Sequence, residues 1–190
     1  MTRAPLSDPG AGSAAAPRPA GRVEIAEATS PEDLAAIRAL CRAFRSWLMV
    51  RYVDHPDIIE AYYAEDRWEA LLDDLPRLHA APEGAILLAR LDGRPAGCAM
   101  FAPLPEPGAC EMKRMYVDGF ARGTGVAAGL VEALCALAKA RGRTVMRLDT
   151  GRIQVEAQAL YARRGFVVRG PYYEAPPSLA DFLVFMERPL

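Results

Sequence analysis

The chain has 190 residues, of which 52% are hydrophobic and 25% are charged, a composition typical of one folded domain. Its formal net charge is -1, so whole-chain electrostatics give no reason to expect binding to nucleic acid or to an anionic membrane. No apolar run approaches the ~20 residues that a membrane-spanning helix needs, and we expect no membrane partner.

The cysteines and histidines are few and widely spaced. The four cysteines include no Cys-x-x-Cys pair, and the chain has two histidines. A zinc site needs clustered ligands, and a disulfide-stabilised fold usually has denser cysteines. We therefore expect no metal, and free thiols in a reducing cytoplasm.

Composition divides the chain into a tail and one domain. Residues 1–21 are dominated by Ala, Pro, Gly and Ser and contain no continuous apolar segment of the signal-peptide kind. Such a segment has too little apolar surface to fold, so it predicts a disordered tail. Residues 22–190 show no second linker and no internal repeat, and predict a single domain.

The domain begins with a predicted strand and a helical region. Residues 22–28 alternate apolar and polar side chains, which predicts a strand. Ser30, followed by a proline, predicts the N-cap of a helix over 30–50. Residues 56–79 predict a second helix, or two, ending near Pro76.

The rest of the domain predicts mainly strands. Two apolar runs within 84–104 flank Asp92-Gly93, which indicates a hairpin. Strands are predicted at 109–117, 144–150, 167–173 and 181–190, and helices at 126–142 and 154–166. This order predicts an α/β (α+β) domain with a mixed central sheet and helices on its faces.

The stretch ARGTGVAAGL at 121–130 places Gly123 and Gly125 just before a predicted helix. A P-loop is excluded, because no lysine follows either glycine. The dinucleotide fingerprint Gly-x-Gly-x-x-Ala is satisfied with Ala128, and Asp149 would bind the ribose. Against it, the motif lies about a hundred residues into the chain, and no second βαβ half follows.

Binding of a pyrophosphate by another kind of loop fits the same residues better. Backbone N–H groups of residues 122–127 and the start of the helix would face an anion. A side chain at Gly123 or Gly125 would block the approach of the diphosphate, and Arg122 would add a charge-assisted pair.

Arg122 to Ala127 form Arg-x-x-Gly-x-Ala, which resembles the acetyl-CoA loop of the GCN5-related N-acetyltransferase (GNAT) superfamily. EMKRMYV before the loop, RLDTG after the helix, and Ala-x-x-Leu-Tyr-x-x-x-Gly-Phe at 157–166 resemble successive motifs of that superfamily. The resemblance extends over nearly everything from Arg22 onward. It implies a GNAT fold, with a mixed, mostly antiparallel sheet and helices on both faces, and an acetyl-CoA-dependent N-acetyltransferase.

The resemblance also implies which residues bind the cofactor. Backbone groups of Met115, Tyr116 and Val117 would bind the pantetheine amides, whereas the side chains of Met115 and Val117 are better explained by core packing. The pyrophosphate would lie on Arg122, Gly123, Thr124, Gly125, Val126 and Ala127. Gln154 stands where the superfamily often has an asparagine that contacts the cofactor.

Two residues are candidates for proton transfer. In the superfamily, the tyrosine in the position of Tyr161 commonly protonates the departing thiolate, and a half-buried structural tyrosine is the alternative. Glu111 lies where some members carry a glutamate, and would accept the proton of the acceptor ammonium. The alternatives are that it binds that ammonium or only pairs with a surface lysine or arginine. No histidine is placed beside Cys110 or Cys135, so we expect direct transfer without an acyl-enzyme.

The acceptor is expected to be a small amine or an amino-acid-like molecule, bound largely by residues 40–80. Alternatives are a non-catalytic acyl-CoA-binding regulatory module, and an acetyltransferase acting on a protein or a tRNA-linked amine. The sequence leaves the oligomeric state open, a homodimer included.

Overall fold

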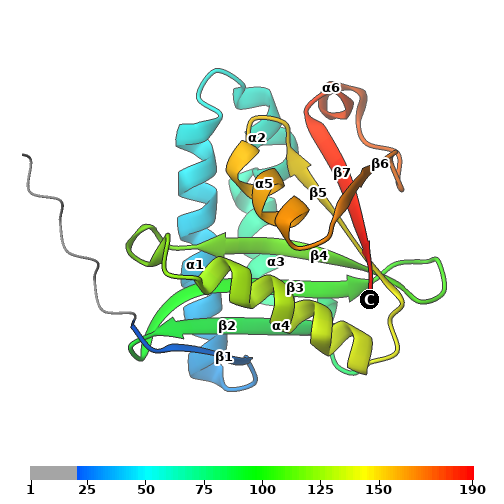
Figure 1. Cartoon of the computed structure of the whole chain (residues 1–190). Coiled ribbons are helices and arrows are strands. Elements are labelled where there is room, and N and C mark those ends of the chain that lie inside the picture. The colour runs from blue at the N-terminus through cyan, green and yellow to red at the C-terminus, as the bar shows by residue number, and fades with distance from the viewer. Residues whose placement is uncertain (1–20) are drawn as a thin grey trace, which may run out of the picture.

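The computed structural model describes residues 21–190, without the side chains of residues 61, 62, 177 and 178. The tail predicted for residues 1–21 therefore lies, except for residue 21, outside the described part. The described chain forms a seven-stranded sheet with helices on both faces (Figure 1). The strands are β1 (Val23–Glu27), β2 (Ala85–Leu91), β3 (Arg94–Pro103), β4 (Ala109–Val117), β5 (Val145–Gly151), β6 (Val167–Arg169) and β7 (Leu183–Pro189). The helices are α1 (Pro31–Arg51), α2 (Pro56–Tyr63), α3 (Glu65–Leu78), the short 3₁₀ helix η1 (Gly119–Ala121), α4 (Val126–Ala140), α5 (Val155–Arg163) and α6 (Pro177–Ala180).

The strands lie in the order β1-β2-β3-β4-β5-β7-β6. Every neighbouring pair is antiparallel apart from β4 and β5, which are parallel. The expected mixed, mostly antiparallel sheet is confirmed. Its single parallel pair is joined by the crossover helix α4, as parallel strands require.

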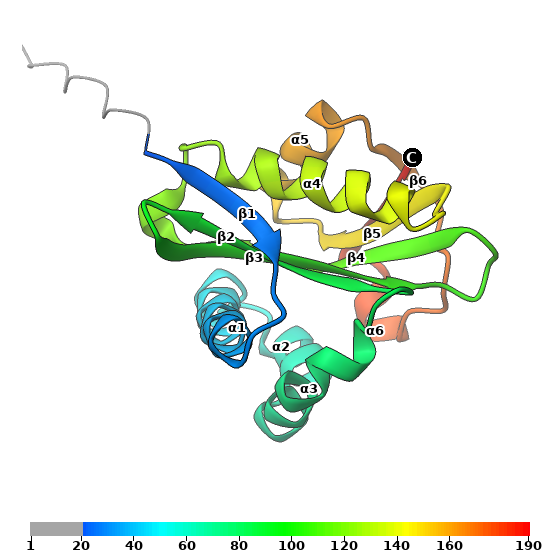
Figure 2. The same ribbon diagram turned by 90° about the horizontal axis from the view of Figure 1, so that it is seen from below.

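The helices form a layer on each face of the sheet. Helices α1, α2 and α3 lie on one side, and α4 and α5 lie on the other (Figure 2). Apolar residues recur at helical spacing in the helix predicted at 126–142, and three of them, Val126, Leu130 and Leu134, are fully buried against the sheet, while Leu137 is partly buried. Burial of each such side chain contributes about 1.5–3 kcal/mol relative to exposure, so the repeat fixes how α4 docks.

Two helix boundaries test the sequence interpretation. The Ser30 hydroxyl accepts a hydrogen bond from the Asp33 N–H (3.0 Å), which confirms the predicted N-cap of α1. The predicted stop at Pro76 is wrong by two residues, since α3 continues to Leu78. Pro76 has no N–H for the Leu72 carbonyl, and the Arg38 guanidinium donates to that oxygen instead (3.2 Å).

The predicted strand at 167–173 is too long. β6 ends at Arg169, and the chain then leaves the sheet. Tyr172 and Tyr173 pack edge-on against Phe185 of β7, with ring centroids 5.3 Å and 5.2 Å away. Burying the two rings on β7 in this way replaces the predicted strand pairing, and the four-residue helix α6 follows without having been predicted.

Candidate active site

The glycine loop between η1 and α4 has the backbone that its sequence suggests. Gly123 and Gly125 adopt φ angles of 78° and 92°, in the left-handed region that favours glycine. A Cβ atom added to either residue would meet no atom within 4 Å. The Thr124 hydroxyl donates to the Ala121 carbonyl oxygen (2.7 Å) and closes the turn. Both glycines therefore present bare backbone to open space.

The first turn of α4 leaves backbone donors at the loop. The Gly129 N–H bonds back to the Gly125 carbonyl (2.9 Å), so the amides of 126–128 lie before the first bond of the helix. The positive end of the helix dipole lies at the same point. Arg122 adds a cation there, with its guanidinium 5.5 Å from the Trp47 ring centroid. The arrangement suits an anion.

Strands β4 and β5 separate next to this loop. Their pairing is confined to Ala109–Glu111 against Val145–Arg147, although both strands continue beyond it. Figure 1 shows the two strands fanning apart from that end. The backbone edge of β4 that faces β5, including Met115, Tyr116 and Val117, thus has no strand partner among the described residues.

The side chains of this edge belong to the core. Val117 is 8% exposed and packs with Met115 in the apolar cluster under α4. Tyr116 points to the other face, where its ring lies 5.6 Å from that of Phe44. Any ligand role of these three residues at the open edge would therefore rest on their backbone N–H and C=O groups.

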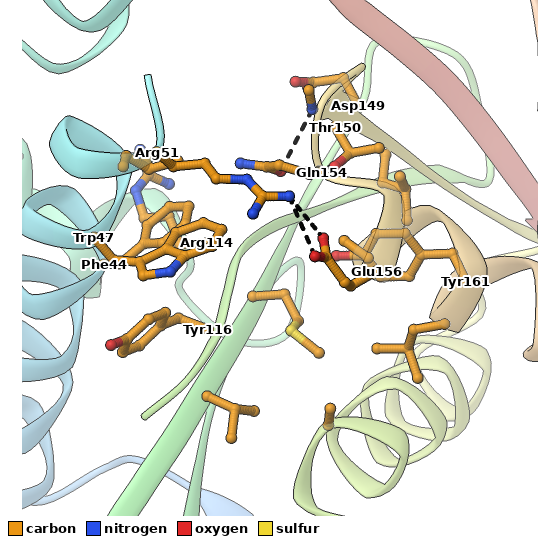
Figure 3. Close-up of a pocket in the computed structure, with 18 of the residues that line it drawn as sticks. Phe44, Trp47, Arg51, Arg114, Tyr116, Asp149, Thr150, Gln154, Glu156 and Tyr161 are labelled. Carbon is orange, nitrogen blue, oxygen red and sulfur yellow. Dashed lines mark hydrogen bonds and ion pairs between the residues drawn. The ribbon is translucent and has the colours of Figure 1, made fainter. Parts of the chain in front are cut away.

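A cavity of about 690 Å³ occupies the gap between the diverging strands. Its walls come from α1, α2 and α3, from β4 and β5, from the glycine loop, and from α5 and the chain after α6 (Figure 3). One end is the glycine loop. Phe44, Trp47, Tyr63 and Trp68 form an aromatic wall elsewhere, so part of the cavity is lined by the segment 40–80, which is expected to bind the acceptor.

An ion pair joins two of these walls. The Arg51 guanidinium at the end of α1 bonds to the Glu156 carboxylate (3.0 Å) and to the Ile153 carbonyl oxygen (2.7 Å) of the α5 region. The contact is drawn in Figure 3. It ties α1 to α5 beside the cavity, and nothing in the local sequence around Arg51 points to a partner about a hundred residues away.

Tyr161, on α5, lies at the cavity. Its ring is 6% exposed and packs on Phe166, with centroids 5.8 Å apart. The hydroxyl makes no hydrogen bond to the residues whose side chains are described. Burial, and secondarily the charge of Asp149, raises the pKa of Tyr161, so the phenol keeps its proton at neutral pH.

Glu111 lies behind the cavity wall and does not line the cavity itself. Its side chain is 8% exposed, and the Tyr172 hydroxyl donates to one carboxylate oxygen (2.6 Å). The Lys113 ammonium pairs with the other oxygen (2.8 Å). These contacts fix the carboxylate in place.

Two acidic residues line the cavity, Asp149 and Glu156, and Glu156 is already paired with Arg51. Burial raises the pKa of Asp149, and the neighbouring Glu111 charge raises it further while Lys113 opposes the shift. The sequence interpretation considered Asp149 only as a ribose ligand. The sequence does not show that Glu111 pairs with Arg147 in the parallel strands β4 and β5. This register places the side chain of Asp149, two residues after Arg147, on the same face of the sheet as that of Glu111.

Gln154 lines the cavity from the N-cap of α5 rather than from the helix itself. Its amide oxygen accepts from the Thr150 hydroxyl (2.9 Å) and the Gly151 N–H (3.4 Å). The helix predicted at 154–166 begins one residue later, at Val155, and Gln154 precedes its first turn. The amide oxygen is engaged, and the amide nitrogen is the group left for a ligand.

Residues 21–190 contain neither a metal-binding cluster nor a membrane-spanning helix. No group of three or more His, Cys, Asp or Glu side chains there could hold a metal ion. None of the helices in that range is long and apolar enough to cross a membrane.

Comparisons with known proteins agree on one family. The model of the acetyltransferase (GNAT) family matches residues 41–166. An IAA acetyltransferase of Azospirillum brasilense is 38% identical over 111 residues, which is 58% of this chain and 71% of that protein. An uncharacterized N-acetyltransferase of Schizosaccharomyces pombe is 37% identical over 101 residues, covering 53% of this chain and 62% of its own length.

The fold has close counterparts among solved structures. An N-acetyltransferase of Thermoplasma acidophilum in complex with coenzyme A matches with a TM-score of 0.68 and 21% identity. The match covers 89% of this chain and 99% of that one.

Proposed function

The chain belongs to the acetyltransferase (GNAT) family, and from that premise we propose that it transfers an acetyl group from acetyl-CoA directly to the amine of a small molecule. One observation carries the proposal. A loop of bare backbone donors and an unpaired strand edge open into the same cavity, which also contains a tyrosine and a carboxylate. The loop suits an anion, the strand edge suits an extended chain with amide groups, and the tyrosine and the carboxylate suit proton transfer.

The residues present fit the cofactor. The pyrophosphate would be held by the N–H groups of residues 123 and 125–127 and by the Arg122 side chain, because the N–H groups of Arg122 and Thr124 already bond within the loop. The pantetheine amides would bond to the open edge of β4 at 115–117, in the manner of an added strand. The Gln154 amide nitrogen would contact the same molecule. In this proposal Val126 contributes through its backbone N–H, because its side chain is buried. Thr124 contributes by closing the turn, since its N–H (3.4 Å) and its hydroxyl (2.7 Å) both bond to the Ala121 carbonyl.

Bound acetyl-CoA supplies a thioester, whose acetyl carbon an amine can attack with loss of the thiolate. The chain must first remove a proton from an acceptor ammonium, which is almost fully protonated at neutral pH. We assign this step to Asp149, whose carboxylate lines the cavity and has a raised pKa. Glu111 supports it, since its negative charge makes Asp149 a stronger base. The base is thus a carboxylate pair.

Tyr161 supplies the acid. Its raised pKa keeps the phenol protonated, so the hydroxyl can donate to the departing sulfur. Direct attack by the amine is also consistent with the state of Cys110 on β4 and Cys135 on α4. Burial raises the pKa of Cys110 to about 12 and that of Cys135 to about 11, so neither is a ready nucleophile.

Release of free CoA thiol tests the proposal. Acetyl-CoA is incubated with the protein and a panel of amines, amino acids, polyamines and aminoglycosides. We expect release that depends on both protein and acceptor. Binding of acetyl-CoA without release for any acceptor would instead identify a non-catalytic binding module. Tight binding of NAD without binding of CoA would overturn the cofactor assignment.

A further inference from the structure

Arg114 is an unpaired cation in the wall of the cavity. It lies on β4 at a bulge, where the register with β3 shifts between Cys98 and Met100. Its φ angle is 50°, an uncommon value for a residue other than glycine. Bulges often redirect a side chain next to a functional site, and this one separates Arg114 from the regular alternation of the strand.

The guanidinium has no acceptor in the described part of the chain. It takes part in none of the salt bridges and hydrogen bonds between described side chains, and its Nε atom is enclosed without a partner. Burial lowers its pKa, yet an arginine stays charged in a protein. Arg51, by contrast, donates through Nη2 to the Glu156 carboxylate and to the Ile153 carbonyl. Arg114 is half-buried, and a partly desolvated cation without an anion is costly, which favours an anionic ligand.

A second donor points the same way. The indole N–H of Trp68 also lacks an acceptor among the described residues, and the Arg114 guanidinium carbon lies 5.8 Å from the Trp68 ring centroid. Both residues line the cavity. The neighbouring carboxylate, Glu111, is already bonded to Tyr172 and Lys113. The unpaired groups of Arg114 and Trp68 are both hydrogen-bond donors, so a ligand that satisfies them must carry a hydrogen-bond acceptor.

The surrounding wall is aromatic. Phe44 and Tyr63 meet edge-on at 6.1 Å, and Tyr63 meets Trp68 at 5.2 Å. Asp149, the proposed base, lines the same cavity. The cavity thus combines a carboxylate for an amine, an apolar surface, and a guanidinium whose planar fork matches a carboxylate.

We propose that Arg114 binds a carboxylate of the acceptor, so that the acceptors are amino carboxylates with an apolar or aromatic body. This inference rests on the proposed acetyl transfer. It separates such molecules from polyamines and aminoglycosides, which carry no anion for Arg114.

The test uses two ligands that differ by one carboxylate, phenylalanine and phenethylamine. We expect the wild type to favour phenylalanine in kcat/KM by about 10- to 100-fold, the contribution of charge-assisted hydrogen bonds. Arg114→Met should bring that ratio close to one, and Arg114→Lys should leave an intermediate ratio. Arg42→Met is the matched control, because Arg42 pairs with Glu69 on the surface, outside the cavity, and its loss should leave the ratio unchanged.

Binding gives a second readout, by calorimetric titration of N-acetylphenylalanine into the protein in the presence of CoA. We expect Arg114→Met to weaken this binding by a similar factor. Equal kcat/KM and equal binding for ligands with and without the carboxylate in the wild type would overturn the proposal. So would an Arg114→Met variant with a lower Tm and an unchanged ratio, since Arg114 would then be structural. Failure of the proposed function is distinct, because neither amine would then release thiol.

Discussion

Gly125→Ala separates the strain of the loop from its role in binding. Gly125 has a φ angle of 92°, and an added Cβ meets no protein atom within 4 Å. The only intrinsic cost is that of placing alanine in the left-handed region, about 1–2 kcal/mol. For a domain of this size, 1 kcal/mol corresponds to about 2–4 °C, so Tm should fall by about 2–8 °C. The Cβ points into the space proposed for the pyrophosphate, and loss of one hydrogen bond to a charged group costs about 1.5–3 kcal/mol. Acetyl-CoA should therefore bind about 10- to 150-fold more weakly.

Gly142→Ala is the control for strain. Gly142 lies just beyond the other end of α4, has a φ angle of 77°, and also faces open space. Its substitution should lower Tm by a similar amount. Calorimetric titration and thermal shift with acetyl-CoA measure both variants, and only Gly125→Ala should lose affinity. Equal affinities in the two variants would refute the assignment of the loop to the pyrophosphate.

Three further outcomes are expected. Tyr161→Phe should lower kcat by about 100-fold, near the low end of general-acid catalysis, with acetyl-CoA affinity nearly unchanged in titration; an unchanged kcat would leave the phenol a structural role. Asp149→Asn should abolish most thiol release but raise Tm at neutral pH. The raised pKa of Asp149 means that the folded state favours the protonated form, so the ionised carboxylate opposes folding above that pKa, and the gain should vanish below pH 3.8. A wild-type Tm equal to or above that of Asp149→Asn at pH 8 would contradict this. Burial lowers the pKa of His79 from 6.5 to about 4, so the folded state binds fewer protons, and the free energy of unfolding should fall by about 3 kcal/mol as pH drops from 6.5 to 4. Urea titrations across that range measure it, and His79→Gln should show a shallower decline.

The local sequence was enough for most of the fold. The apolar repeat Val126, Leu130, Leu134 predicted α4, and Asp92-Gly93 predicted the hairpin of β2 and β3, because both patterns act between near neighbours in sequence. The ends of elements were harder. α3 passes Pro76, and the carbonyl that the proline leaves free accepts from Arg38 on another helix, a contact that the local sequence does not indicate.

The site was predicted unevenly for the same reason. A loop is a continuous segment, so its glycines could be singled out from their spacing. Asp149 and Arg114 could not be assigned a role, because their environment depends on strand register, on a bulge and on side chains from α3 and the chain after β6. The hydrogen bond from the Tyr172 hydroxyl to the Glu111 carboxylate forms because the chain leaves the sheet after Arg169. The apolar pattern of 167–173 predicted a continuous strand there instead.

The central claim is acetyl transfer from acetyl-CoA to an amine within this cavity, and a labelled acetyl group follows it directly. Acetyl-CoA with a deuterated acetyl group is incubated with the protein and the amine panel, and products and protein are analysed by mass spectrometry. We expect at least one amine to carry the deuterated acetyl group, with the protein itself unlabelled. Unmodified amines throughout, or a labelled cysteine on the protein that passes its acetyl group to the amine, would contradict direct transfer by this chain.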